Sequence, residues 1–330
     1  MRVLFIGGTG IISTEVSRLA VARGIDLWIL NRGRRSAPIE GARTLVADVS
    51  DPASVTDALG NERFDCVVDW IAYVPQEVER HLALVLPRTR QYVFISSASA
   101  YEKPPRSPFV TESTPLKNPY WEYSRNKIAC EDLLVRAYRE QDCPVTIVRP
   151  SLTYDSVLPI AVGGWGCATL LDRLKSGREI IVHGDGTSLF VLTHAADFAK
   201  GFVPLLGHPQ AIGQIFHITS DEVLTWNQIY ATIADALGVA AQVVHIPSGF
   251  IARHDPESGP GLLGDKTHSL IFDNSKIKRT VPDYLATIPF HEGIRRTLAW
   301  FAADPTRWVV RQDVHDTMDR TIAAWRRAEG

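Results

Sequence analysis

The first 150 residues alternate short apolar runs with amphipathic segments, and this alternation limits the possible folds more than any other feature. Strands that are apolar on both faces need cover on both sides, which parallel sheets obtain from helices. The sequence therefore predicts an α/β fold with a doubly wound parallel sheet. The predicted strands are VLFIGG at 3–8, DLWILN at 26–31, TLVAD at 44–48, FDCVVDWIA at 64–72, QYVFISS at 91–97 and VTIVRP at 145–150.

Turn and capping residues mark the segments between these runs. Gly24 follows the amphipathic segment 11–23 and is a common type of helix end. Asp51 precedes Pro52, which is the pattern of an N-cap followed by proline in the first helical turn. Five prolines lie between residues 102 and 119, so this segment is expected to be a loop that leads into a helix.

A glycine-rich turn follows the first predicted strand. In RVLFIGGTGIIS, Gly7 permits a tight turn and Gly10 allows close approach to the backbone at the start of a helix. Backbone N–H groups and the helix dipole can hold a pyrophosphate there, which predicts a dinucleotide-binding (Rossmann) fold. Ser13 stands where a third glycine is usual and should crowd helix against strand slightly. The other loop residues expected at this site are Thr9, Ile11 and Ile12.

The residues at the end of the second predicted strand favour a phosphorylated cofactor. An acidic residue usually meets the adenosine ribose of NAD there, about 20 residues beyond the glycines. This chain has Asn31 and Arg32, with Arg35 behind them, and arginine attracts a 2′-phosphate. We therefore favour NADP(H), with NAD(H) as the alternative.

Asp48 either accepts from the adenine amino group or is a turn acid before a helix. The remaining residues expected at this site are Val49, Ile71 and Ala72.

Charge and cysteine content argue against several classes of protein. The 35 basic and 37 acidic residues leave a formal net charge of -2, so no broad positive field is available for nucleic acid. The four cysteines form no CxxC pair and have no histidine at zinc spacing, which indicates buried thiols without a metal site or disulfides.

No segment approaches the ~18 apolar residues of a membrane span. The N-terminal apolar run is too short for a signal peptide. We expect a cytoplasmic protein.

A tyrosine and a lysine lie four residues apart at the start of the helix expected after residue 119. A lysine beside a phenol favours the phenolate, so we expect a lowered pKa for Tyr123. The strand run YVFISSASAY at 92–101 ends in hydroxyls at the sheet edge where ligands bind. A serine there can hold a substrate oxygen while Tyr123 moves a proton and a nicotinamide exchanges hydride. The residues expected to share the inward helix face are Tyr123, Lys127, Cys130, Leu134 and Ala137.

With these motifs the sequence resembles the short-chain dehydrogenase/reductase superfamily in its extended form, the NAD-dependent epimerase/dehydratase family. Tyr123 and Lys127 match its YxxxK motif, and SSASAY at 96–101 is similar to its SSxxxY strand end. The resemblance implies that Ser97, Tyr123 and Lys127 are catalytic. RPSLTYD at 149–155 resembles the family's RPxxxYG segment, which implies that Pro150 lies beside the nicotinamide. The family often pairs through the YxxxK helix, so a homodimer is one expectation.

The resemblance also sets the expected domain boundaries. VHGDGTSLFVLTHAADFAKGF at 182–202 is similar to the stretch that returns to the cofactor domain, with Asp197 opening a helix. We expect a dinucleotide-binding domain at 1–150 and 189–222, and a smaller C-terminal substrate-binding lobe at 151–188 and 223–330. Within that lobe, VGGWG at 162–166 and ESGPGLLG at 257–264 are expected to be irregular.

Departures from the family pattern bear on the substrate. Ala98 and Ser99 stand where the family's sugar 4,6-dehydratases carry an Asp-Glu pair, which argues against elimination of water by that route. Phe190 replaces the arginine that usually meets the diphosphate in sugar-nucleotide epimerases, while Arg279 in NSKIKR matches their second arginine. Ser99 and Arg279 are the residues expected to contact the substrate, a small molecule for which a sugar nucleotide is one candidate.

Three functions stay open. We favour an enzyme of this family that transfers hydride at a sugar or sugar-nucleotide carbon. An NADPH-dependent reductase of a ketone or aldehyde is the first alternative, and a non-catalytic dinucleotide-sensing or RNA-binding module is the second. The near-neutral charge and the intact Ser97, Tyr123 and Lys127 argue against the module. The sequence has neither a GxSxG hydrolase motif nor a P-loop.

Overall fold

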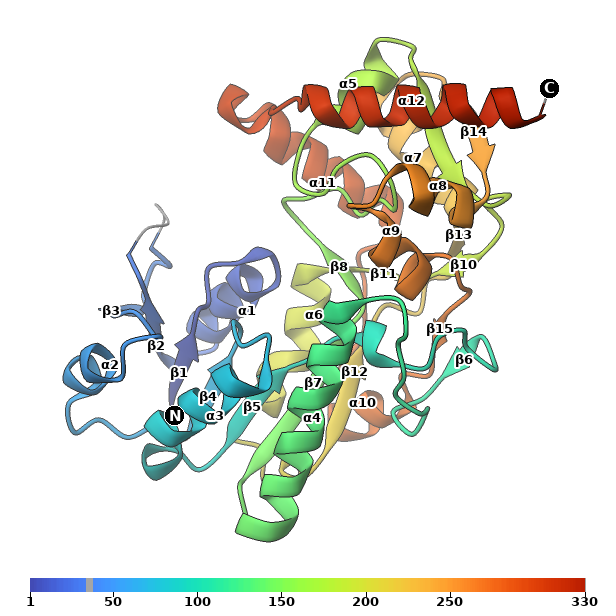
Figure 1. Cartoon of the computed structure of the whole chain (residues 1–330). Helices are drawn as coiled ribbons and strands as arrows, with labels where there is room; N and C mark the ends of the chain where they lie inside the picture. Colours follow the sequence, from blue (N-terminus) through green and yellow to red (C-terminus); the bar gives the residue numbers. More distant parts are fainter. Residues whose placement is uncertain (34–37, 330) are drawn as a thin grey trace.

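A seven-stranded parallel sheet forms the base of the computed structural model, which describes residues 1–33 and 38–329 (Figure 1). The strand order is β12-β7-β5-β4-β1-β2-β3, so the chain winds outward in both directions from β1. Each predicted apolar run overlaps one of these strands, which confirms the expected fold class. The strands are β1 (Arg2–Ile6), β2 (Asp26–Asn31), β3 (Arg43–Val46), β4 (Cys66–Asp69), β5 (Tyr92–Ile95), β7 (Val145–Pro150) and β12 (Ile215–Ile218).

Helices cover both faces of the sheet because successive strand side chains point to opposite sides. In β1, Val3 and Phe5 belong to the core beneath α1 and α6, whereas Leu4 and Ile6 belong to the core beneath α2, α3 and α4. The first face is covered by α1 (Ile11–Ala22), α6 (Ala195–Phe202) and α10 (Ser275–Thr280). The second face is covered by α2 (Pro52–Leu59), α3 (Pro75–Val85) and α4 (Glu122–Gln141).

Local signals in the sequence correctly located several helix ends. The Asp51 carboxylate caps α2 by accepting from the backbone N–H groups of Ala53 at 3.1 Å and Ser54 at 3.3 Å. Helix α1 ends just before Gly24, whose φ of +76° lies in the left-handed region. The four cysteines are free and buried, as expected. Among the described residues, none of the helices combines the length and apolarity needed to cross a membrane.

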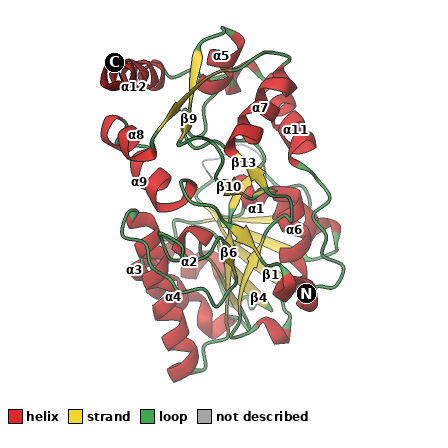
Figure 2. Cartoon of the chain, turned by 90° about the vertical axis from the view of Figure 1, so that its right-hand side faces the viewer, coloured by secondary structure: helices red, strands yellow, loops and turns green. Residues whose placement is uncertain are grey.

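A second region, the upper lobe, lies over the carboxyl ends of the strands (Figures 1 and 2). Its buried core includes Leu170, Ile181, Trp226, Ile229 and Ile294. The helices of this lobe are α5 (Thr169–Lys175), α7 (Trp226–Leu237), α8 (Ser248–His254), α9 (Gly259–Gly261), α11 (Phe290–Ala302) and α12 (Gln312–Glu329). Its short strands pair as β8 (Leu152–Tyr154) with β11 (Leu192–His194), β9 (Glu179–His183) with β14 (Gln242–Ile246), and β10 (Leu189–Phe190) with β13 (Leu224–Thr225). The residue boundaries of the two domains stay a prediction.

Two segments expected to be irregular contain regular structure. The segment 257–264 forms α9, and the π-helical turn Leu262–Lys266 follows it. Proline is tolerated here because it stands in the first turn, and the buried Leu262 anchors the segment in the core of the upper lobe. Within the proline-rich segment, β6 (Phe109–Val110) pairs with β15 (Ile271–Phe272). The segment 162–166 is irregular, as predicted.

Candidate active site

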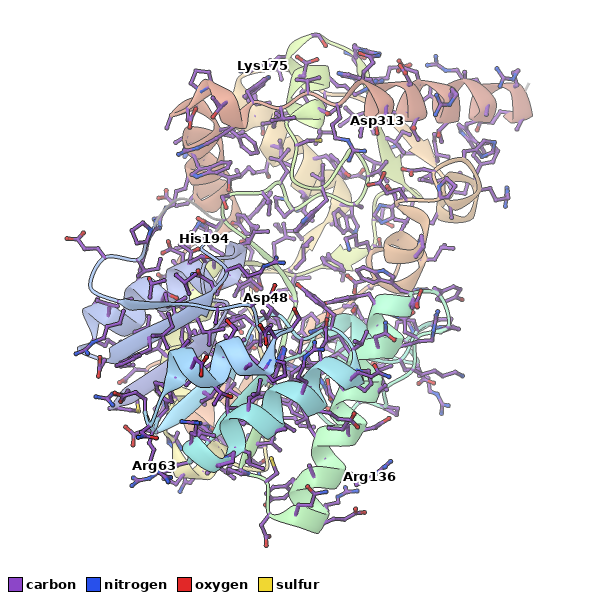
Figure 3. All side chains as sticks on the ribbon, turned by 60° about the vertical axis from the view of Figure 1, so that its left-hand side comes forward. Asp48, Arg63, Arg136, Lys175, His194 and Asp313 are labelled. Atoms are coloured by element: carbon purple, nitrogen blue, oxygen red, sulfur yellow. The ribbon has the colours of Figure 1, made fainter. Side chains whose placement is uncertain are left out.

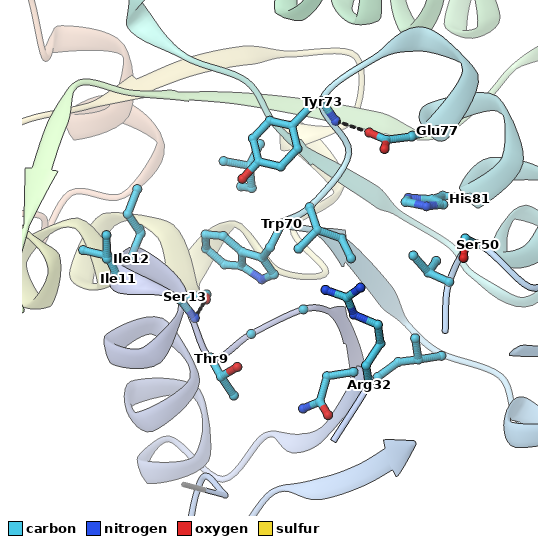
Figure 4. Close-up of a pocket in the computed structure, with 18 of the residues that line it drawn as sticks. Thr9, Ile11, Ile12, Ser13, Arg32, Ser50, Trp70, Tyr73, Glu77 and His81 are labelled. Carbon is cyan, nitrogen blue, oxygen red and sulfur yellow. Dashed lines mark hydrogen bonds between the residues drawn. The ribbon is translucent and has the colours of Figure 1, made fainter. Parts of the chain in front are cut away.

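A cavity of about 690 Å³ opens at the carboxyl ends of the strands (Figure 4). Asp48 lies at this end of the sheet, which faces the upper lobe (Figure 3). Ala72 does not line the cavity; its carbonyl oxygen instead accepts a hydrogen bond from Lys127. Arg35 lies outside the described residues. The residues expected at the dinucleotide site that line this cavity are Gly7, Thr9, Gly10, Ile11, Ile12, Asn31, Arg32, Asp48, Val49, Ile71 and Pro150.

The glycine loop forms the floor of this cavity. Gly7 and Gly8 have φ angles of +93° and +110°, which side chains rarely allow. A Cβ atom on Gly7 would lie 2.8 Å from Cγ2 of Ile71, so the turn has no room for one. Ser13, which stands at the third glycine position, is buried, and its Oγ accepts from the Gly10 N–H at 2.8 Å. Ser13 therefore caps α1. Its Oγ takes up the Gly10 N–H, a donor that could otherwise bind a phosphate.

The buried carboxylate of Asp69 at the end of β4 is a feature that the sequence analysis missed. It accepts from the backbone N–H groups of Ile71 at 3.1 Å and Ala72 at 3.0 Å, from Tyr92 Oη at 2.7 Å, and from His81 Nδ1 at 2.6 Å. Burial alone would raise the pKa of Asp69, but these hydrogen bonds, foremost that from His81, hold it below its usual value. The sequence feature that could have identified Asp69 is an acidic residue at the end of an apolar run.

His81 lines the same cavity and was also missed. It lies on the inward stripe of α3 with Val78, Leu82 and Val85, where a polar residue is unusual. Its Nδ1 meets Asp69, while its Nε2 is buried and has no hydrogen-bond partner among the described residues. Figure 4 shows the ring extending from α3 toward the cavity, near Ser50.

Lys127 lies on the inward face of α4, as predicted, and is 2% exposed. Its Nζ donates to the carbonyl oxygens of Ala72 at 2.7 Å and Ile95 at 2.8 Å. The same atom lies 4.7 Å from the ring centroid of Tyr73 and 4.8 Å from that of Phe94. Burial lowers the pKa of Lys127 to about 8, although the charge of Asp69 opposes this shift.

Tyr123 does not have the lowered pKa that the sequence suggested. Burial raises the pKa of Tyr123 to about 12, and a hydrogen bond with Ser97 only partly offsets this effect. The expected influence of Lys127 is weak because its ammonium group contacts two backbone carbonyls and lies 5.8 Å from the Tyr123 ring centroid. The phenol is therefore held in its neutral form.

A second cavity of about 540 Å³ lies between the sheet and the upper lobe. Ser97 and Ser99 line it, and their Oγ atoms lie 2.8 Å apart, while Ser124 Oγ donates to Ser99 Oγ at 2.7 Å. Arg279 of α10 lines neither cavity, so the structure does not bring it to the substrate position expected for it. The residues that line both cavities are Ile12, Tyr73, Tyr123 and Pro150.

Acidic and apolar side chains dominate the second cavity. Phe190 is buried in its wall at the position of the missing arginine, and Trp121 and Trp165 add aromatic surface. Lys266 is the one basic residue that lines it among the described residues, with Nζ 3.4 Å from Oδ2 of Asp265. Arg311 does not line the cavity, but it pairs with two of its acidic residues, Glu257 at 3.6 Å and Asp313 at 2.5 Å. The acidic residues that line the cavity are Asp255, Glu257, Asp265 and Asp313. No group of three or more potential ligands for a metal ion occurs in the described part of the chain.

Comparison with known proteins identifies relatives that cover most of the chain. A family model described as the NAD dependent epimerase/dehydratase family matches residues 3–219. A 2′-dehydrokanamycin reductase from Streptomyces kanamyceticus is 26% identical over 287 residues, which is 86% of this chain and 80% of the relative. The chloroplast stem-loop binding protein of 41 kDa b from Arabidopsis thaliana is 29% identical over 259 residues, but the match covers 74% of this chain and only 65% of that protein.

A solved structure supports the fold assignment over nearly the full length. The UDP-glucose 4-epimerase of Thermus thermophilus, solved in complex with NAD, superposes with a TM-score of 0.72. The match covers 92% of this chain and 99% of the epimerase at 19% sequence identity.

Gly7→Ala should weaken dinucleotide binding by about tenfold or more, which corresponds to about 1.4 kcal/mol of lost binding free energy. The added Cβ would meet Ile71 at 2.8 Å and distort the floor of the cavity. Gly24→Ala is the matched control, because Gly24 also has a positive φ but its Cβ would meet nothing within 4 Å. Calorimetric titration of both variants checks this. Equal loss of binding in the two variants would contradict the assignment of the loop.

Lys127→Met should remove a rise in stability that the wild-type protein shows at alkaline pH. The folded lysine has a pKa of about 8 and an unfolded one titrates near 10.5, so the unfolded chain binds more protons between these values. The free energy of unfolding of the wild type, relative to the variant, should therefore increase across this window by up to ~3 kcal/mol. Denaturant titrations from pH 7 to pH 10.5 test this, with Lys117→Met, at an exposed position, as the control. Parallel curves for wild type and Lys127→Met would refute the predicted shift.

Proposed function

The chain belongs to the NAD dependent epimerase/dehydratase family, and on that premise we propose that it transfers hydride at a sugar carbon through Ser97, Tyr123 and Lys127. One observation carries the proposal: Tyr123 lines both cavities and thus stands where a cofactor in one meets a substrate in the other. Lys127 lines the first cavity, and Ser97 lines the second.

The first cavity fits a dinucleotide. Its floor has room only for glycine at residue 7, and three buried donor or acceptor atoms without partners among the described residues, Trp70 Nε1, Arg80 Nε and His81 Nε2, belong to residues that line it. When bound, the nicotinamide supplies or accepts the hydride. Lys127 uses two of its three N–H groups on backbone carbonyls, which leaves one for an oxygen of the cofactor.

The two hydroxyl groups act on the substrate oxygen. Ser97 Oγ contacts both Tyr123 and Ser99, so it holds a substrate oxygen in reach of the phenol. The neutral phenol of Tyr123 donates its proton to that oxygen during reduction, and the phenolate takes a proton during oxidation.

We propose NADP(H) as the cofactor because Arg32 lines the first cavity at the end of β2, where NAD-dependent enzymes usually present an acid. Arg80 of α3 lines the same cavity and adds a second positive charge. A homodimer and a cytoplasmic location stay predictions from the sequence.

Reduction of a sugar ketone, without a nucleotide, is the second candidate function. Phe190 and four carboxylates line the substrate cavity, which disfavours a diphosphate. A reductase of 2′-dehydrokanamycin is also the relative that covers 86% of this chain. The stem-loop binding named for the Arabidopsis protein is not proposed here, because this chain has a net charge of -2 and retains all three catalytic side chains.

Tyr123→Phe should reduce turnover by ~100 to 10,000-fold, which is the usual contribution of a general acid or base, and leave cofactor affinity nearly unchanged. Only the phenol oxygen is lost, so the wall of both cavities keeps its shape. Tyr120→Phe, at a tyrosine 40% exposed and two positions before α4, is the control and should retain activity. Comparable turnover by Tyr123→Phe and the wild type would eliminate Tyr123 as the proton carrier.

Isotope transfer separates epimerisation from reduction. An epimerase retains its cofactor and returns hydride to the carbon from which it came, whereas a reductase draws hydride from exchangeable NADPH. NADPH deuterated at the transferable position is supplied with keto sugars and with sugar nucleotides, and products are read by mass spectrometry. Deuterium in product at one equivalent per NADPH consumed supports reduction. Unlabelled epimer formed without consumption of NADPH supports epimerisation, and neither product from any sugar contradicts both.

A further inference from the structure

His81 presents an unpaired hydrogen-bonding atom to the cofactor cavity. The side chain is 1% exposed, and its Nε2 is buried without a partner among the described residues. Buried polar atoms are almost always paired, and an unpaired one lowers stability by about 1 to 3 kcal/mol. Because His81 lines the cavity, a bound ligand is the natural partner for this atom.

The hydrogen bond with Asp69 determines which tautomer neutral His81 adopts, and hence which kind of ligand group its Nε2 can bind. The Asp69 carboxylate is fully buried, and its lowered pKa keeps it negative, so it accepts the proton on His81 Nδ1 at 2.6 Å. In the neutral imidazole the other nitrogen then carries a lone pair and accepts a hydrogen bond. In its neutral form, His81 therefore favours a donor group on the ligand and disfavours a phosphate oxygen.

The position of His81 in the cavity indicates which part of a dinucleotide it meets. The proposed catalytic end of the cavity is marked by Tyr123 and Lys127, whereas His81 lies near Ser50, beyond the end of β3 (Figure 4). Asp48 and Val49 of the same turn line this end. With the pyrophosphate over the glycine loop, the adenine base occupies the end near β3. Its 6-amino group is a donor with two hydrogens.

We propose that His81, oriented by Asp69, accepts a hydrogen bond from the 6-amino group of the cofactor's adenine and so selects adenine over a 6-oxo base. Asp69 acts here as a positioning residue. One hydrogen of the amino group would pair with His81 Nε2, which has no partner among the described residues. This inference rests on the proposed use of a nicotinamide dinucleotide.

The test compares NADP⁺ with its hypoxanthine analogue, in which an oxygen replaces the 6-amino group. His81→Asn removes Nε2 but retains an amide N–H close to the position of Nδ1, so the bond to Asp69 can persist. Tyr92→Phe is the matched control, because it removes another donor to Asp69 at 2.7 Å without changing an atom that lines the cavity. Dissociation constants of both nucleotides are measured by calorimetry at pH 8 for the three proteins.

The wild type should bind NADP⁺ about 10 to 100-fold more tightly than the analogue, because a 6-oxo group places an acceptor against His81 Nε2 instead of donating to it. His81→Asn should lower this ratio at least fivefold, and Tyr92→Phe should keep it. An unchanged ratio in His81→Asn, or equal binding of the two nucleotides by the wild type, overturns the role of His81 and leaves the proposed function intact. A wild type that binds neither nucleotide overturns both.

Discussion

The buried carboxylate of Asp69 is the interaction on which the site depends. It joins the end of β4 to Tyr92 on β5, to His81 on α3, and to the backbone of residues 71 and 72. The turn that it fixes supplies the Ala72 carbonyl that holds Lys127. One anion thus links the wall of the first cavity to Lys127. A buried charge is costly unless several donors satisfy it, and Asp69 has four.

Tyr123 and Lys127 are both shifted toward their neutral forms by the same cause. Removing them from water raises the pKa of Tyr123 to about 12 and lowers that of Lys127 to about 8. In the proposed mechanism a neutral phenol is the form that gives a proton to a carbonyl oxygen, so this protonation state suits the reductive direction. A positive nicotinamide beside the phenol would favour the phenolate and hence the oxidative direction. The charge of the bound cofactor can therefore match the protonation state of Tyr123 to the direction of hydride transfer.

The sequence predicted six of the seven strands of the sheet, the glycine loop and the inward face of α4, because each depends on local periodicity and on glycine or proline chemistry; it did not predict β12. It did not predict the roles of His81 and Asp69. These residues are 12 positions apart in the sequence, on a helix and a strand, and only the tertiary packing shows that their side chains form a hydrogen bond. The wrong pKa direction for Tyr123 has a similar origin. Sequence spacing placed Lys127 beside the phenol, but it could not show that two backbone carbonyls bind the ammonium group.

The upper lobe determines what can react at Tyr123, because it supplies most of the second cavity's wall. Asn118 connects the two regions by donating to the carbonyl oxygens of Ser99 at 2.8 Å and Gly264 at 2.7 Å. These bonds hold the π-helical turn, with Asp265 and Lys266, in the wall of the cavity that Ser97 and Ser99 also line. A diphosphate at this point would meet carboxylates and the apolar ring of Phe190, and Lys266 already lies beside Asp265. A neutral or positively charged sugar would lose less on entering, since carboxylates and tryptophan faces attract ammonium and hydroxyl groups. The charge of the upper lobe thus argues for a substrate without a nucleotide, even though the catalytic residues below it match those of a family that includes sugar-nucleotide enzymes.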